Sequence, residues 1–242
     1  MPLPVTFLDH LRREGYHPRS NKHSNALGTA IAFDLVTSCE PLARRAAEGA
    51  VVYDLNFDLR VRTATWNVDL VLGRPASAQR PEGDLAIRRA RPSSIEIAIE
   101  IKSVMTEHRK AVKNRKRDLE AHHEHVHNYR QDAIAGGVFV VNRSRTFKSP
   151  LRGGQVTTHA RHETAMFDLV GHCINELRNV AERNDPSGYG LDAKLAIVAS
   201  MDNVALPSTS YWERPPAPQV GDPLHYDSFL QRLCEQYRQR FA

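Results

Sequence analysis

The chain has 242 residues, of which 41% are hydrophobic and 25% are charged, and these proportions are ordinary for a globular protein with a buried core. The net charge of +5 weakly favours a polyanionic partner. No apolar run approaches roughly 18 residues and no signal-peptide core is present. We therefore expect a cytoplasmic protein rather than a membrane protein. Cys39, Cys173 and Cys234 are scattered and odd in number, which predicts reduced thiols and argues against structural zinc.

The N-terminal quarter of the chain has the pattern of helices. Residues 5–14 predict a short helix, and residues 25–49 predict a longer one whose apolar face includes Leu27, Ile31 and Leu35. Proline does not fit inside a helix, so Glu40-Pro41 predicts a break or a restart.

Three strands are expected next, over residues 51–61, 66–73 and 94–102. In the third, four isoleucines alternate with Glu96, Ala98, Glu100 and Lys102, which is the period of a half-buried strand. The connection Arg74–Pro92 is long, polar and rich in Pro, Gly and Arg.

The second half of the chain begins with a polar helix over residues 106–129, followed by an apolar strand over 135–142. A basic loop over 143–152 leads to an amphipathic helix over 163–183 and a short strand over 195–199. A proline-rich segment over 205–225 should be extended on the surface, and a last helix is expected over 226–241. We therefore predict an α/β protein with one domain, in which a core of about residues 25–142 carries an extension over 143–242 packed on it.

Glu100 and Lys102 point the same way from one strand end, roughly 6.6 Å apart at about 3.3 Å per residue. If the preceding strand is a neighbour in the sheet, Asp69 can converge on them. Two carboxylates suit a hard divalent cation such as Mg2+, and a nearby lysine can orient water or stabilise negative charge. The alternative is a solvated strand end with a plain ion pair.

Val68-Asp69 followed by Glu100-Ile101-Lys102 resembles the D…(D/E)-x-K motif of the PD-(D/E)xK nuclease superfamily, which includes many type II restriction endonucleases. The resemblance implies an αβββαβ core with a mixed central sheet flanked by helices, plus C-terminal helical additions. It also implies that Asp69, Glu100 and the Ile101 carbonyl bind the metal and that Lys102 is catalytic. Val68 departs from the family, which often has proline there. An additional acid on the first helix is implied as well, and Asp34 and Glu40 are the candidates.

The function that follows from this resemblance is a Mg2+-dependent DNA endonuclease, with Mn2+ able to substitute, in restriction or another defence role. A homodimer acting on double-stranded DNA is expected, since cutting both strands needs two sites. The alternatives are a non-catalytic nucleic-acid-binding subunit and an RNA nuclease. The residues expected to contact phosphates are basic and lie on the polar helix or the loop after it: Arg109, Lys110, Lys113, Arg115, Lys116, Arg117, Arg143, Arg145, Lys148 and Arg152.

Two other groups of polar residues have simpler interpretations. Glu96 shares the predicted face of Glu100 but lies roughly 13 Å away at about 3.3 Å per residue, so we interpret it as a surface or supporting group. His122, His123, His125 and His127 form no H-E-x-x-H zinc motif, and solvated histidines or phosphate contacts are expected there.

Overall fold

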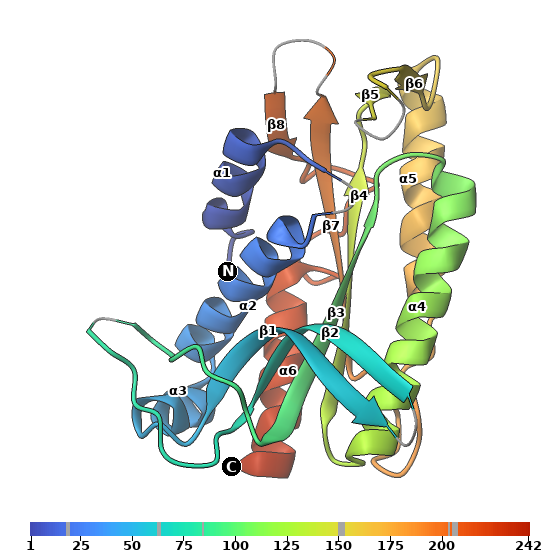
Figure 1. Ribbon diagram of the computed structural model, residues 1–242. Coiled ribbons are helices and arrows are strands. Elements are labelled where there is room, and N and C mark those ends of the chain that lie inside the picture. The colour runs from blue at the N-terminus through green and yellow to red at the C-terminus, as the bar shows by residue number, and fades with distance from the viewer. Residues whose placement is uncertain (18–19, 62–63, 84, 150–152, 203, 205–207) are drawn as a thin grey trace.

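The computed structural model describes residues 1–242 apart from 18–19, 62–63, 84, 150–152, 203 and 205–207 (Figure 1). A six-stranded sheet in the order β1-β2-β3-β4-β7-β8 runs through the molecule. β1, β2 and β3 are antiparallel, β3, β4 and β7 are parallel, and β8 is antiparallel to β7. The strands of this sheet are β1 (Val52–Val61), β2 (Ala64–Arg74), β3 (Ser94–Val104), β4 (Ile134–Asn142), β7 (Ala193–Asp202) and β8 (Ser208–Tyr211).

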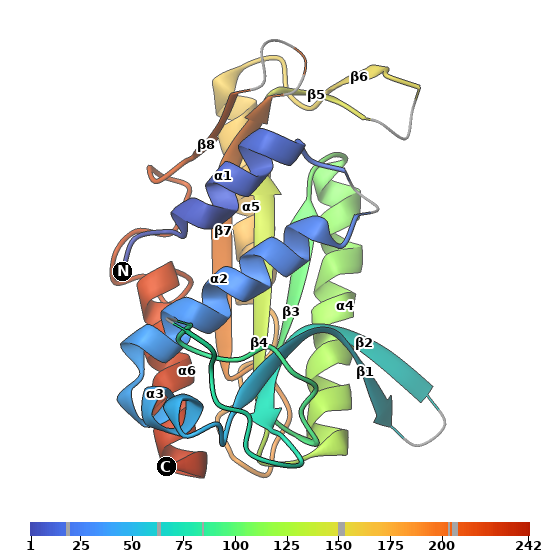
Figure 2. The same cartoon turned by 60° about the vertical axis from the view of Figure 1, so that its left-hand side comes forward.

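Helices cover both faces of this sheet, and a hydrophobic cluster fills each side (Figures 1 and 2). Ile97, Ile99 and Ile101 of β3 belong to the cluster under the N-terminal helices and the C-terminal helix, whereas Ala98 and Val104 belong to the cluster on the other face. The helices of the first face are α1 (Val5–Glu14), α2 (Lys22–Ser38), α3 (Glu40–Ala47) and α6 (Tyr226–Phe241), and those of the second are α4 (His108–Tyr129) and α5 (Glu163–Arg178). The predicted α/β fold with a mixed central sheet flanked by helices is therefore confirmed.

The local signals in the sequence explain most boundaries. Pro41 lies in the first turn of α3, and extended backbone at Cys39 separates α3 from α2. The apolar seam of Val112, Leu119 and Val126 on α4 is fully buried. Gly137 of β4 lies beneath this seam, where a Cβ would come 2.6 Å from a Leu191 methyl carbon, so the close packing of helix on sheet depends on glycine there.

The C-terminal extension differs from the prediction, because it adds two strands to the main sheet where one short strand was expected. β7 pairs in parallel with β4 and is longer than the strand expected over 195–199. β8 lies in the proline-rich segment that is expected to be extended on the surface, and it pairs with the edge of the sheet at β7. A two-stranded sheet of β5 (Thr146–Lys148) and β6 (Val156–Thr158) occupies the region after β4. The single-domain organisation stays a prediction.

The prediction that Glu96 shares the face of Glu100 is wrong. Leu72 and Gly73 of β2 pair with Ile97 and Ile95, so Glu96 is an extra residue in a bulge and the alternation shifts there. Glu96 is buried and receives hydrogen bonds from Arg45 (2.8 Å) and from the Tyr237 hydroxyl (2.9 Å), which belong to helices on the opposite face from α4.

The prediction of reduced thiols is also wrong for two of the three cysteines. Cys39, between α2 and α3, forms a disulfide with Cys234 of α6, with their Cα atoms 5.4 Å apart. Cys173 is free and buried. Because disulfides are rare in a reducing cytosol, the cysteines no longer support a cytoplasmic location. Among the described residues, no helix combines the length and the hydropathy needed to cross a membrane.

Candidate active site

The three motif residues meet where β2 separates from β3. The two strands pair as far as Leu70 and Ile99, and beyond that point the β1–β2 hairpin turns away from β3 (Figure 2). Asp69 and Glu100 are the next residues on the two sides of this fork. The Asp69 carboxylate accepts a hydrogen bond of 2.8 Å from the backbone N–H of Ile101, which holds it against β3. The chain therefore places an acid from β2 beside an acid of β3.

Lys102 completes the group from the same face of β3 as Glu100. Its Nζ forms an ion pair with Oε1 of Glu100. The Glu100 side chain is only 2% exposed, whereas that of Lys102 is 23% exposed. The lysine is thus the member of the pair that solvent reaches.

Burial and mutual repulsion shift the protonation of both acids. Burial, together with the neighbouring Asp69 carboxylate, raises the pKa of Glu100 to about 8, against the opposing effect of Lys102. Burial raises the pKa of Asp69 as well, opposed by Lys102, the Ile101 N–H and the Ser24 hydroxyl. Burial disfavours the Lys102 ammonium, but Glu100 and Asp69 outweigh it and raise its pKa. Because two acids share one ammonium, the ionised form of Glu100 is disfavoured unless a further cation is present.

The donor set fits a hard divalent cation. Oε2 of Glu100 is fully buried and has no hydrogen-bond partner among the residues that the structure describes. Such an oxygen beside a second carboxylate can be satisfied by a metal ion, and Mg2+ is commonly held by one or two carboxylates with water in its other positions. Within the described ranges, no group of three or more His, Cys, Asp or Glu side chains could hold a metal ion, so Asp69 and Glu100 would be the ligands of these residue types.

Several polar residues that the sequence did not single out surround this group. Asn56 of β1, opposite Asp69 in the hairpin, has a positive φ of 53° and donates a hydrogen bond of 2.7 Å to Asn25 of α2. Ser24 precedes Asn25; its hydroxyl donates to the Asn21 carbonyl at 3.2 Å and lies near enough to Asp69 to lower the pKa of that carboxyl. Asparagine tolerates the left-handed region, but nothing in the sequence marks this position in advance.

The first-helix acids predicted to join the site are not brought to it. α2 approaches the fork by its first turns, at Ser24 and Gly28, whose Cβ position lies 3.8 Å from an Ile101 side-chain carbon. Asp34 is ten residues further along, roughly 15 Å at about 1.5 Å per residue, and accepts a hydrogen bond from Tyr226. Glu40 is exposed on α3 and pairs with Arg44 at 3.5 Å. Both candidate acids thus lie further along the N-terminal helices than the turns of α2 that approach the fork.

His122 lies against the site, which corrects the expectation of solvated histidines. It is fully buried on α4, with Nδ1 3.9 Å from Oε2 of Glu100 and Nε2 3.3 Å from the Ala98 carbonyl oxygen. Burial lowers the pKa of His122 to about 3. His108, His123 and His127 are buried too, because this face of α4 packs on the sheet.

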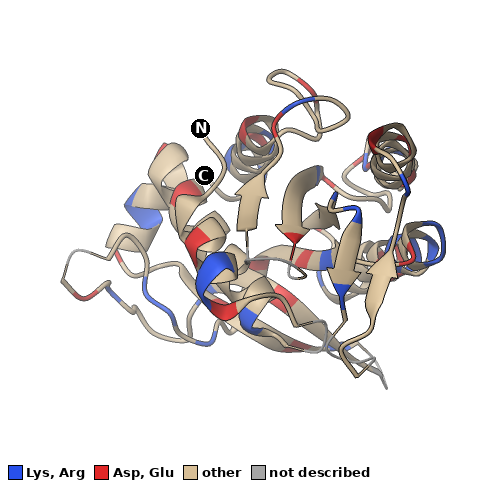
Figure 3. Cartoon of the chain, turned by 90° about the horizontal axis from the view of Figure 1, so that it is seen from above, with Lys and Arg blue, Asp and Glu red and all other residues tan. Residues whose placement is uncertain are grey.

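The basic residues of α4 divide into free and paired side chains. Figure 3, which looks down from the upper end of Figure 1, shows Lys and Arg along α4 at the right-hand side. Arg115 pairs with Asp118 at 3.0 Å, and Lys116 lies 3.8 Å from Glu120 and from Glu176. Four others are exposed and have no ion pair with any described residue: Arg109, Lys110, Lys113 and Arg117.

The basic loop does not form a continuous exposed surface. Arg143 pairs with Glu163 at 2.5 Å, and its guanidinium carbon lies 3.5 Å from the centre of the Trp212 ring. Arg145 donates to the Arg161 carbonyl, and Lys148 lies on β5. Arg152 lies outside the described residues.

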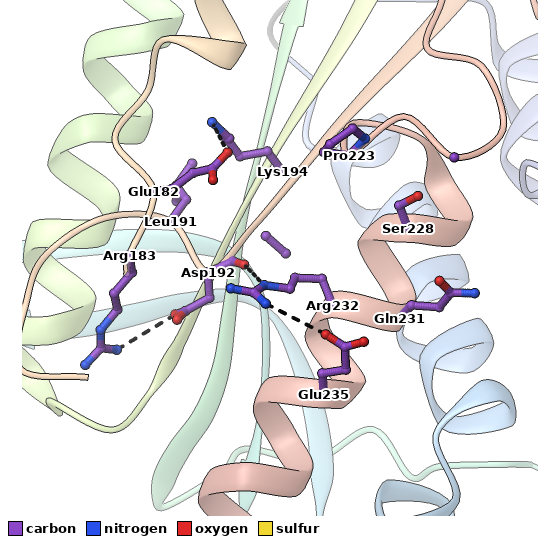
Figure 4. Close-up of a pocket in the computed structure, with 12 residues that line it drawn as sticks. Glu182, Arg183, Leu191, Asp192, Lys194, Pro223, Ser228, Gln231, Arg232 and Glu235 are labelled. Atoms are coloured by element: carbon purple, nitrogen blue, oxygen red, sulfur yellow. Dashed lines mark hydrogen bonds and ion pairs between the residues drawn. The ribbon is translucent and has the colours of Figure 1, made fainter. Parts of the chain in front are cut away.

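A separate hollow of about 470 Å³ between α6 and the segment before β7 contains several charged side chains (Figure 4). They pair with one another: Arg183 with Asp192 at 3.8 Å, Arg232 with Glu235 at 3.8 Å, and Lys194 with Glu182 at 2.8 Å. We therefore assign this network to stability rather than to binding.

Comparison of this chain with known proteins finds one distant structural similarity. No known family model matches it, and no curated protein matches it. One solved structure to which it is similar is P. aeruginosa ATCC27853 NucC in its cAAA-bound form, with a TM-score of 0.38 and 12% sequence identity over 99% of this chain and 89% of that one. A likeness at this level is too distant to transfer a function, so we infer the function from the topology and the site themselves.

Proposed function

We propose that this protein is a metal-dependent endonuclease that hydrolyses phosphodiester bonds in DNA. The observation that supports this most is the convergence of Asp69, Glu100 and Lys102 at the fork between β2 and β3, with a buried Glu100 oxygen that lacks a partner among the described residues. The elements from α3 to β4 have the order αβββαβ, with α2 immediately before them, and this order agrees with the resemblance to the PD-(D/E)xK superfamily. Restriction or another defence role, a homodimer and a cytoplasmic location belong to the same proposal.

In this mechanism Asp69 and Glu100 would hold the cation, with the Ile101 carbonyl as a further ligand. The chemistry that Mg2+, or Mn2+ in its place, would supply when bound is a lower pKa for water and stabilisation of negative charge on the phosphate. Lys102 keeps its proton at neutral pH because its pKa is raised, so it acts as a hydrogen-bond donor to the attacking water or to the developing charge. The Ile101 N–H fixes the orientation of Asp69.

The exposed cations of α4 supply the contacts to the DNA backbone. Arg109, Lys110, Lys113 and Arg117 follow β3 directly in the chain, and their charges attract phosphates irrespective of base sequence. Recognition of bases would require further groups in a groove of the duplex.

The test is incubation of plasmid, linear and single-stranded DNA, and of RNA, with the protein in Mg2+, in Mn2+ and in EDTA. We expect cleavage of DNA that requires metal and falls by at least ~100-fold in Asp69→Asn and in Lys102→Ala. Asp58→Asn is the matched control, because Asp58 is exposed on the neighbouring strand β1. Full activity in Lys102→Ala would refute the assignment of the site.

The alternative is a protein that binds nucleic acid without cutting it, and the exposed cations of α4 would serve that function equally well. Thermal denaturation in Mg2+ discriminates between the two. Stabilisation by Mg2+ that disappears in Asp69→Asn supports the catalytic proposal, whereas salt-sensitive DNA binding with no effect of metal supports the alternative.

A further inference from the structure

Two hollows adjoin each other beyond the ends of β4 and β7, away from the candidate active site. One has a volume of about 440 Å³ and the other about 610 Å³, and Arg143 and Glu163 line both. Asp69, Glu100 and Lys102 line neither. The carboxyl ends of parallel strands are a common location for ligands in α/β proteins.

The smaller hollow is polar and carries an excess of cationic groups. Arg143, Arg145 and Arg161 line it together with the acids Glu163 and Asp202. The guanidinium of Arg161 is exposed and has no partner among the described residues. Ser144 and Ser200 contribute hydroxyl groups 3.2 Å apart. Arginines with hydroxyl donors are the groups that bind a phosphate.

The larger hollow is apolar and lies between α5 and the segment that follows β8. Met166, Phe167 and Val170 of α5 form one wall, and Trp212 and Pro216 form the other. Phe167 is 49% exposed although it is large and apolar. Flat and apolar side chains of this kind suit an aromatic ring.

We propose that the two hollows together bind one nucleotide, with its phosphate among the arginines and its base against Phe167 and Trp212. Arg143 stands at the boundary and touches both environments, since it faces Glu163 on one side and the Trp212 ring on the other. Both hollows have the size of small-molecule sites, which favours a free nucleotide over a DNA strand. This binding site goes beyond the nuclease activity proposed above and uses none of its residues at the fork.

Glu163 provides a way to test the site without removing it. Its carboxylate pairs with Arg143 at 2.5 Å and lies 3.9 Å from Arg145, so it competes with an incoming phosphate. Its side chain is 65% exposed, and Glu163→Gln keeps its shape. The substitution should therefore strengthen nucleotide binding, whereas Arg161→Gln should weaken it.

The experiment is a titration of the full chain with AMP, GMP, CMP and TMP, followed by Trp212 fluorescence in a Trp66→Phe background and by calorimetry of the unmodified protein. The chain has two tryptophans, so this background isolates the reporter. We expect at least one nucleotide to bind with a Kd of roughly 10 µM to 1 mM. Adenosine or guanosine without phosphate, and inorganic phosphate alone, should bind at least ~10-fold more weakly, because each fills one hollow only.

The variants decide the outcome. We expect Arg161→Gln to weaken binding by about 10-fold and Glu163→Gln to strengthen it several-fold, with no change in Arg44→Gln, an exposed arginine on α3. The proposal is overturned if no nucleotide binds, if all variants bind alike, or if only long DNA alters Trp212 fluorescence. Because Asp69→Asn should bind nucleotide as the unmodified protein does, failure here is distinguishable from failure of the nuclease proposal.

Discussion

At the scale of single residues, Glu100 shows how one side chain can be unfavourable for folding and useful for function. Its carboxyl is buried between Asp69 and His122, and only Lys102 offsets its charge. A bound cation would stabilise the ionised carboxylate. Without one, burial and the neighbouring Asp69 keep the carboxyl protonated up to about pH 8. Sites that bind charge commonly cost stability in this way.

Glu100→Gln should therefore stabilise the metal-free protein at high pH. The pKa of Glu100 is raised from 4.5 when unfolded to about 8 when folded, so the wild type loses stability as pH rises through this window. Glutamine cannot ionise, and the variant should gain on the order of 1–3 kcal/mol at pH 8.5 and little at pH 4.5. Chemical denaturation in EDTA at both pH values measures this. Glu48→Gln, at an exposed position, is the control, and an equal gain at both pH values would contradict the explanation.

At the scale of elements, α4 combines a buried face with a basic outer face. Val112, Leu119, Val126 and His122 pack on the sheet, which fixes the helix beside the fork. The exposed cations of its first half then stand close in the chain to Lys102. The proposed DNA-binding surface thus consists of residues whose charge has no ion-pair partner in the described part of the chain.

Replacing Lys110, Lys113 and Arg117 together with glutamine should weaken DNA binding for all sequences alike. The slope of log affinity against log salt should fall by up to about 0.9 for each phosphate that the variant no longer neutralises. Fluorescence anisotropy with Asp69→Asn protein, over a range of salt concentrations, measures this slope. Arg13→Gln, Arg44→Gln and Arg238→Gln together serve as the matched neutralisation of three charges on α1, α3 and α6, and a slope unchanged in the α4 variant would remove α4 from the interface.

At the scale of the whole molecule, the C-terminal helix α6 is covalently linked to the segment between the N-terminal helices α2 and α3. α6 packs beside α2 and α3, and the Cys39–Cys234 disulfide spans a sequence separation of 195 residues (Figure 1). Arg45, Glu96 and Tyr237 form a buried network in the same region. The N-terminal helices that approach the active site are therefore held in place by the C-terminal helix.

Reduction of the disulfide should lower the free energy of unfolding by about 2–5 kcal/mol, because the cross-link restricts the unfolded chain. Cys39→Ser should show the same decrease and no further effect of reductant. Denaturant unfolding with and without reductant measures this, and thiol titration of the denatured protein should find Cys173 alone before reduction. Equal stability of oxidised and reduced protein would contradict the prediction.

Much of the fold could be predicted from the sequence because it is encoded in local periodicity. The alternation in β3, the seven-residue spacing in α4 and the position of Pro41 each determine a backbone form within a few neighbouring residues. The bulge at Glu96 was not predicted, because a bulge depends on how the strand pairs with its neighbour, here with Leu72 and Gly73 of β2. The two strands come so close at this point that a Cβ on Gly73 would lie 2.0 Å from the Ser94 carbonyl oxygen.

For the candidate site, the sequence by itself determined that Glu100 and Lys102 share a face, because residues two apart do so wherever a strand is regular. It also marked Asp69 as the acid of a neighbouring strand. Only the tertiary structure decided that β2 separates from β3 at Asp69, that α2 arrives with Ser24 and Asn25 rather than with Asp34, and that His122 lies against Glu100. Those contacts join residues far apart in the chain, and their geometry depends on helix directions and strand register that no local pattern contains.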